Sequence, residues 1–94
     1  MLDFYFILDA QSNTTPPRQL RYAGGIEEEE FEMAQRTGLI EGHADFYGKF
    51  RWSSEQVKNK LALLANCSFR SSTALNTILN QANAAEVGLV AFGD

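Results

Sequence analysis

The chain holds one set of residues of the types that nucleophilic catalysis uses. Cys67 is its single cysteine, His43 is its single histidine, and Asp45 follows His43 by two positions. Together they could supply a nucleophile, a general base and an orienting carboxylate. Cys67, however, lies in an expected turn between two helices without a recognisable nucleophile motif, and nothing in the sequence brings it to His43. We therefore expect no catalytic site, and we interpret His43 as a loop residue.

The sequence also gives no pattern for a metal ion or a cofactor. Zinc needs about three protein ligands even at a catalytic site, and the chain offers one His and one Cys among scattered carboxylates. A helical run of glutamates lacks the hinge glycine and the spaced oxygens of a calcium loop. Gly24 and Gly25 precede acidic residues, which would repel a phosphate. We expect neither a metal site nor a cofactor.

Negative charge is concentrated in one run of the chain. Residues 1–45 carry nine acidic and three basic side chains (−6), whereas residues 46–94 carry three acidic and five basic ones (+2). An acidic patch accelerates association with a basic protein, and the lack of a basic footprint disfavours nucleic acid. The alternative role of the run is a solvated first turn of a helix, which the helix dipole favours. The candidate partner-binding acids are Glu27, Glu28, Glu29 and Glu30.

Aromatic and cationic side chains are combined in the segment 46–52. Four of the eleven aromatic residues lie there, and strict alternation would place Tyr47, Lys49 and Arg51 on one face. Tyrosine and arginine are frequent at binding hot spots, so these three residues are candidates for partner binding. The alternative is that they pack on the domain's own surface. The other aromatic residues of the segment, Phe46, Phe50 and Trp52, are expected in the core. The segment is either a strand or an irregular stretch that these rings anchor to the core.

A second kind of site is an anion-accepting pocket. Arg18, Arg21, His43 and Arg51 would line it, between a long loop and the segment 43–52. Two arginines on a loop can equally pair with the glutamate run.

Size and composition set the class of protein. Ninety-four residues with 45% hydrophobic side chains and a net charge of −4 are typical of a single folded domain spanning 1–94. A lone cysteine excludes an intrachain disulfide and fits a reducing compartment. The apolar N-terminal segment lacks the basic residues of a signal peptide, and no apolar run approaches the ~18 residues of a membrane span. We expect a cytoplasmic protein that does not enter the membrane.

Hydrophobic periodicity predicts strands at both ends of the chain and three helices between them. Residues 2–9 and 87–92 read as buried strands. The glutamate run opens a helix at 27–37, a capping box opens one at 54–65, and an i, i+3, i+4, i+7 stripe marks one at 72–84. These elements predict an α+β fold, a small α/β sandwich. Its sheet has two to four strands, with the terminal strands adjacent.

Two details complete the expected fold. Residues 10–25 contain Pro16, Pro17 and a Gly-Gly pair, which predict a long loop that holds at most a short extended piece. In the helix 54–65, Lys58 and Lys60 fall off the apolar stripe.

The function that this pattern favours is a non-enzymatic protein-interaction module. Small bacterial accessory, adaptor and immunity-type proteins share this acidic, disulfide-free profile. The acidic run and the aromatic–cationic segment would bind a basic protein partner, and an exposed aromatic patch would also suit a homodimer. The alternative is a small-molecule-binding or regulatory domain that uses the anion-accepting pocket.

Overall fold

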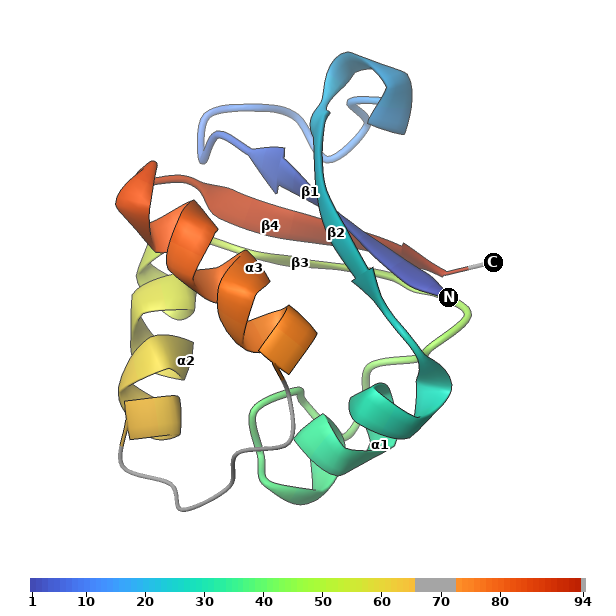
Figure 1. The fold of residues 1–94 in the computed structure, drawn as a ribbon. Helices are drawn as coiled ribbons and strands as arrows, with labels where there is room; N and C mark the ends of the chain where they lie inside the picture. Colours follow the sequence, from blue (N-terminus) through green and yellow to red (C-terminus); the bar gives the residue numbers. More distant parts are fainter. Residues whose placement is uncertain (66–72, 94) are drawn as a thin grey trace.

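A four-stranded antiparallel sheet and three helices make up the fold (Figure 1). The computed structural model describes residues 1–65 and 73–93. The predicted α+β class is therefore confirmed. In chain order, the elements are β1 (Leu2–Ile7), the 3-10 helix η1 (Pro17–Gln19), β2 (Arg21–Ile26), α1 (Glu28–Arg36), β3 (Lys49–Trp52), α2 (Ser54–Ala65), α3 (Thr73–Ala84) and β4 (Gly88–Gly93).

The two terminal strands lie side by side in the middle of the sheet. The strand order is β2-β1-β4-β3, and β1 pairs with β4 from Leu2 opposite Gly93 to Ile7 opposite Gly88. This confirms the predicted adjacency of the terminal strands. The edges of the sheet are β2 and β3.

Helices α2 and α3 run in opposite directions against one face of the sheet (Figure 1). The stripe predicted for α3 is buried, with Leu75 and Leu79 fully inaccessible to solvent. It packs into one cluster with side chains of the central strands such as Phe4 and Leu89. Burial of this apolar surface is the main force that holds the layers together.

The other face of the sheet carries no helix within the described residues, but its side chains pack against one another and against the segment after β1. The Tyr5 ring lies between those of Tyr22 and Phe92, at centroid distances of 5.4 and 5.7 Å. Val90 is 1% exposed on the same face. Arg51, opposite Val90 in the register, donates to the Leu8 and Gln11 carbonyls and so holds the segment after β1 over this region.

The prediction of a loop through residue 25, with at most a short extended piece at 18–22, is wrong for residues 23–25, which belong to β2. The glycine pair indicates a break on sequence alone, yet it lies within the strand. Gly24 has a φ of 147°, and a Cβ there would come within 3.0 Å of Ile78 Cδ1. Glycine at this position therefore lets α3 approach the strand closely.

The segment 46–52 combines the two structures expected for it. Phe46 belongs to a turn in which the Gly48 amide donates to the Asp45 carbonyl at 3.0 Å, and β3 begins only at Lys49. Phe46 and Trp52 are buried. The prediction that the aromatic rings anchor this segment to the core is confirmed for both.

Lys60, which lies off the apolar stripe predicted for its helix, is nevertheless only 5% exposed. Its ammonium donates to the Leu39 carbonyl and to Glu41 Oε2, both at 2.7 Å. The same nitrogen lies 4.4 Å from the centroid of the Trp52 ring, whose Nε1 donates to Glu41 Oε1 at 3.0 Å. A buried cation is tolerated here because hydrogen bonds and an opposite charge replace its water.

Candidate functional sites

Helix α1 and the turn before β3 meet in an open groove of about 480 Å³. The Tyr47 hydroxyl donates to Glu28 Oε2 at 3.3 Å. The acidic run and the aromatic segment, far apart in the sequence, are thus brought together. Phe31 and Phe46 underlie the groove, with ring centroids 5.4 Å apart. This acidic groove is lined by Glu28, Phe31, Glu32, Gln35, His43, Ala44, Asp45, Phe46 and Tyr47.

The turn that forms one wall of the acidic groove is fixed by α1. The Gln35 side-chain amide donates to the carbonyls of Glu41 at 2.9 Å and of Ala44 at 3.0 Å. Asp45 Oδ1 accepts the Tyr47 amide at 3.0 Å, which closes a local turn. The wall is therefore positioned before any partner arrives, which lowers the entropic cost of binding.

The field within the acidic groove is negative. Glu28, Glu32 and Asp45 are exposed carboxylates, and the Tyr47 side chain is 62% exposed beside them. The negative charge of Glu28, followed by partial burial and the hydrogen bond to the same carboxylate, raises the pKa of Tyr47 above its ordinary 10.0. His43 also lines the groove and is exposed.

The other glutamates of the acidic run have different surroundings. Glu27 occupies the N-cap position of α1, and Glu27 and Glu29 are exposed. Glu30 Oε2 accepts the Leu75 amide at 3.0 Å, so it satisfies a backbone donor in the first turn of α3. The run is therefore divided: Glu28 lines the groove, while Glu30 joins two helices.

Lys49 and Arg51 hold the chain segment after β1, and neither lines the acidic groove that Tyr47 lines. Arg51 Nη1 donates to the Gln11 carbonyl at 2.9 Å and to Asn13 Oδ1 at 2.6 Å. Lys49 Nζ donates to the Asn13 carbonyl and lies 5.1 Å from the Phe92 ring centroid. Both cations therefore contact the protein's own chain. Such packing on the domain's own surface was the alternative to partner binding.

The residues expected around an anion-accepting pocket are also separated. Arg18 is exposed on η1, and Arg51 is bound to the segment after β1. Arg21 and His43 line two different pockets that share no residue. Arg21 alone keeps the surroundings that an anion site needs, an open cavity beside apolar side chains.

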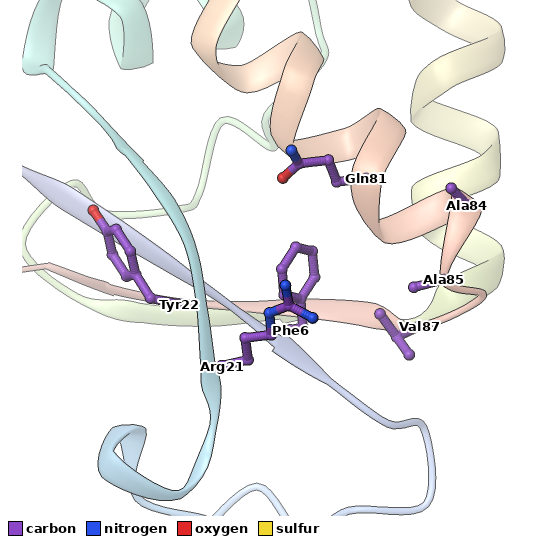
Figure 2. Close-up of a pocket in the computed structure, with 7 residues that line it drawn as sticks. All are labelled: Phe6, Arg21, Tyr22, Gln81, Ala84, Ala85 and Val87. Atoms are coloured by element: carbon purple, nitrogen blue, oxygen red, sulfur yellow. The ribbon is translucent and has the colours of Figure 1, made fainter.

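The cavity at Arg21 lies where the starts of β2 and β4 meet the end of α3. We call it the edge pocket; its volume is about 650 Å³. Figure 2 shows Phe6, Arg21 and Gln81 gathered between the strands and the helix, with Tyr22 on the other side of the β2 ribbon. It is lined by Phe6, Arg21, Tyr22, Gln81, Ala84, Ala85 and Val87.

The nucleophilic set considered from sequence falls partly outside the structure. His43 and Asp45 both line the acidic groove, but Cys67 lies outside the described residues. Within residues 1–65 and 73–93, no group of three or more His, Cys, Asp or Glu side chains is arranged to hold a metal ion.

Sequence patterning could not have revealed the pairing of Glu28 with Tyr47, because nineteen positions separate them. It also gave no signal for the edge pocket beyond Arg21 itself. Ala84 and Ala85 leave space in the pocket because their side chains are small. In the sequence, alanine residues indicate only a helix.

Comparison with family models, with curated proteins and with solved structures gave no significant match. Among the described helices, none has both the length and the apolar character that a membrane crossing requires.

Proposed function

We propose that the protein is a non-enzymatic interaction module that binds a basic protein partner through the acidic groove. The observation that carries this proposal is the contact between Tyr47 and Glu28, with Glu32 and Asp45 lining the same groove. An arginine or lysine of the partner would lie against the Tyr47 ring and pair with the flanking carboxylates. Cation–π contact and charge-assisted hydrogen bonding act together in such a site.

Two further features support a basic partner. The acidic N-terminal half of the chain supplies every carboxylate in the groove. Its negative charge therefore attracts a basic partner both at long range and at the contact itself. Lys49 and Arg51 are engaged within the chain, and we therefore assign the first contact to α1 and Tyr47. A module of this kind suits an adaptor, accessory or immunity-type protein.

The proposal is tested by titrating the protein with an arginine tripeptide and recording backbone amide NMR spectra. We expect saturable shifts at Asp45 and Tyr47 that weaken as salt is added. Replacing Glu28→Gln and Glu32→Gln together should weaken binding about three- to tenfold, because exposed pairs contribute modestly.

The matched control carries Glu55→Gln and Glu86→Gln, which remove the same charge at exposed positions outside the groove. It should bind the tripeptide nearly as tightly as the unmodified protein. Equal weakening in both double variants, or the absence of saturable shifts at the groove, would contradict the proposal.

A further inference from the structure

The edge pocket combines an apolar wall with a cation on one face of the sheet. Phe6 and Arg21 are direct partners in the β1–β2 register, so their side chains share a face, the one that α3 covers. Tyr22 pairs with Tyr5, and its hydroxyl donates to Asp3 Oδ1 at 3.0 Å. Tyr22 therefore points to the opposite face and contributes only to the rim.

Small side chains keep the pocket open. Ala84 ends α3, and Ala85 follows it in the turn toward β4. A longer side chain at either position would extend into the cavity over Phe6 and Val87. The volume of about 650 Å³ lies within the range of small-molecule sites.

The polar groups of the pocket have no partners of their own. Within the described part of the chain, neither the Arg21 guanidinium nor the Gln81 side-chain amide makes a hydrogen bond or an ion pair. Arg51, in contrast, donates to four oxygens of the segment after β1. Arg21 therefore keeps its full donor set for a ligand, in the fork geometry that matches a carboxylate.

The neighbouring helix end limits the charge of the ligand. The C-terminus of α3 has negative dipole character, which opposes an anion. That effect is reduced because the amides of Ala85, Glu86 and Val87 cap three of its carbonyls. A single guanidinium can then hold a monoanion, whereas a phosphate group with two charges would be less well matched.

We propose that the edge pocket binds a small carboxylic acid with a compact apolar body. The carboxylate pairs with the Arg21 guanidinium and accepts from the Gln81 amide, and the apolar body lies against Phe6, Ala84 and Val87. This site shares no residue with the acidic groove. The proposed ligand site can therefore be tested separately from the protein-binding function.

The test uses three probes that separate charge from apolar area. Phenylacetate has both features, phenethylamine has the ring with a cation, and acetate has the carboxylate alone. We expect phenylacetate to give saturable NMR shifts at Gln81, Ala84 and Val87, with a dissociation constant of about a millimolar. Acetate should bind at least tenfold more weakly, and phenethylamine should not shift these signals.

Two variants and one matched control complete the test. Arg21→Gln should weaken phenylacetate binding about tenfold or more, because a charge-assisted contact is lost. Arg18→Gln removes the same charge from exposed η1 and should leave binding unchanged. Ala84→Leu keeps Arg21 but fills the cavity, and should abolish binding while the rest of the spectrum stays folded.

The proposal is overturned if phenylacetate gives no saturable shifts at the pocket. It is also overturned if Arg21→Gln and Arg18→Gln bind phenylacetate equally, or if phenethylamine binds there as well as phenylacetate.

Discussion

Lys60 shows what a single charged side chain can contribute when it is buried. Its ammonium meets a backbone carbonyl, the Glu41 carboxylate and the Trp52 ring. These contacts join the segment after α1, the end of β3 and the middle of α2. Because the Glu41 side chain is 36% exposed, its charge is shared with solvent and the ion pair alone contributes little. The stabilising effect comes mainly from satisfied hydrogen bonds and packing.

Removing this ammonium should destabilise the fold. We expect Lys60→Ala to lower the free energy of unfolding by about 1–3 kcal/mol, because the Leu39 carbonyl loses its donor and the packing against Trp52 is lost. Urea unfolding followed by Trp52 fluorescence measures this change. Lys58→Ala, at an exposed position of the same helix, should change stability by less than about 0.5 kcal/mol. Similar effects of the two substitutions would contradict the role given to Lys60.

The same cluster makes stability depend on pH. Partial burial opposes ionisation of Glu41, but hydrogen bonds from Lys60 and Trp52 outweigh it and place the pKa of the carboxyl below its ordinary 4.5. The folded protein therefore binds this proton less readily than the unfolded chain. Ionised Glu41 stabilises the fold above about pH 4.5, and that stabilisation is lost as the pH falls through the lower folded pKa.

Comparison with Glu41→Gln isolates this contribution from other carboxylates such as Asp9, whose pKa is also lowered, chiefly by its hydrogen bond with the Ser54 side chain. The stability advantage of the unmodified protein over Glu41→Gln should be present at neutral pH and should shrink at about pH 3. An advantage that is constant with pH, or that grows in acid, would show that Glu41 ionisation does not stabilise the fold.

At the scale of the element, the end of α3 is closed by a motif that favours glycine. The Val87 amide donates to the Ala82 carbonyl at 3.0 Å and the Glu86 amide to the Asn83 carbonyl at 3.1 Å, the pattern of a Schellman motif. Glu86 is the second residue after the end of α3 in this motif, and it has a φ of 57°. A β-carbon is strained in this conformation, and a negative charge at a helix C-terminus is unfavourable.

Glu86→Gly should therefore stabilise the protein by about 0.5–1 kcal/mol, because it removes both the strain and the charge. Glu86→Ala is the matched control, since it removes the charge and keeps the β-carbon. Urea unfolding of the two variants should find the glycine variant more stable. An alanine variant that is equally or more stable would contradict the strain assigned to this position.

The sequence predicted elements well where periodicity was long and flanked by strong signals. The stripe of α3 and the capping box of α2, in which the Ser53 hydroxyl accepts the Gln56 amide at 3.2 Å, both led to correct helices. It failed at β2, because Gly24 and Gly25 act as breakers unless another element packs against them. At Gly24 that packing comes from Ile78 on α3, and at Gly25 it comes from Met1 and Asp3 near the start of β1; no local window contains these residues.

Site prediction from the sequence had a similar limit. Residue type singled out Tyr47 and Glu28 as separate candidates for partner binding, and the fold places the two side chains in contact. The same reasoning grouped Tyr47 with Lys49 and Arg51 from the strict alternation of the segment, with a strand and an anchored irregular stretch both left open. The strand begins at Lys49, so the alternation does not extend back to the tyrosine. The partners of the two cations, such as Asn13, lie more than thirty positions away.

At the scale of the whole molecule, the fold separates two open sites of opposite character. The acidic groove is lined by residues of α1 and of the turn before β3. The edge pocket lies at the end of α3 against β1 and β2, and Figure 2 shows the residues that line it. The groove presents carboxylates around a tyrosine and the pocket presents an arginine above apolar side chains. We infer that a partner protein and a small acid would bind at different places on the surface.

Binding of a basic protein by the acidic groove can be measured by affinity capture from a lysate of the source organism. The immobilised protein, the groove variant with Glu28→Gln and Glu32→Gln, and the control with Glu55→Gln and Glu86→Gln are compared at low and high salt. We expect one stoichiometric basic partner at low salt, held by the unmodified and control proteins and lost from the groove variant. A partner held equally by all three, or no partner at either salt concentration, would contradict it.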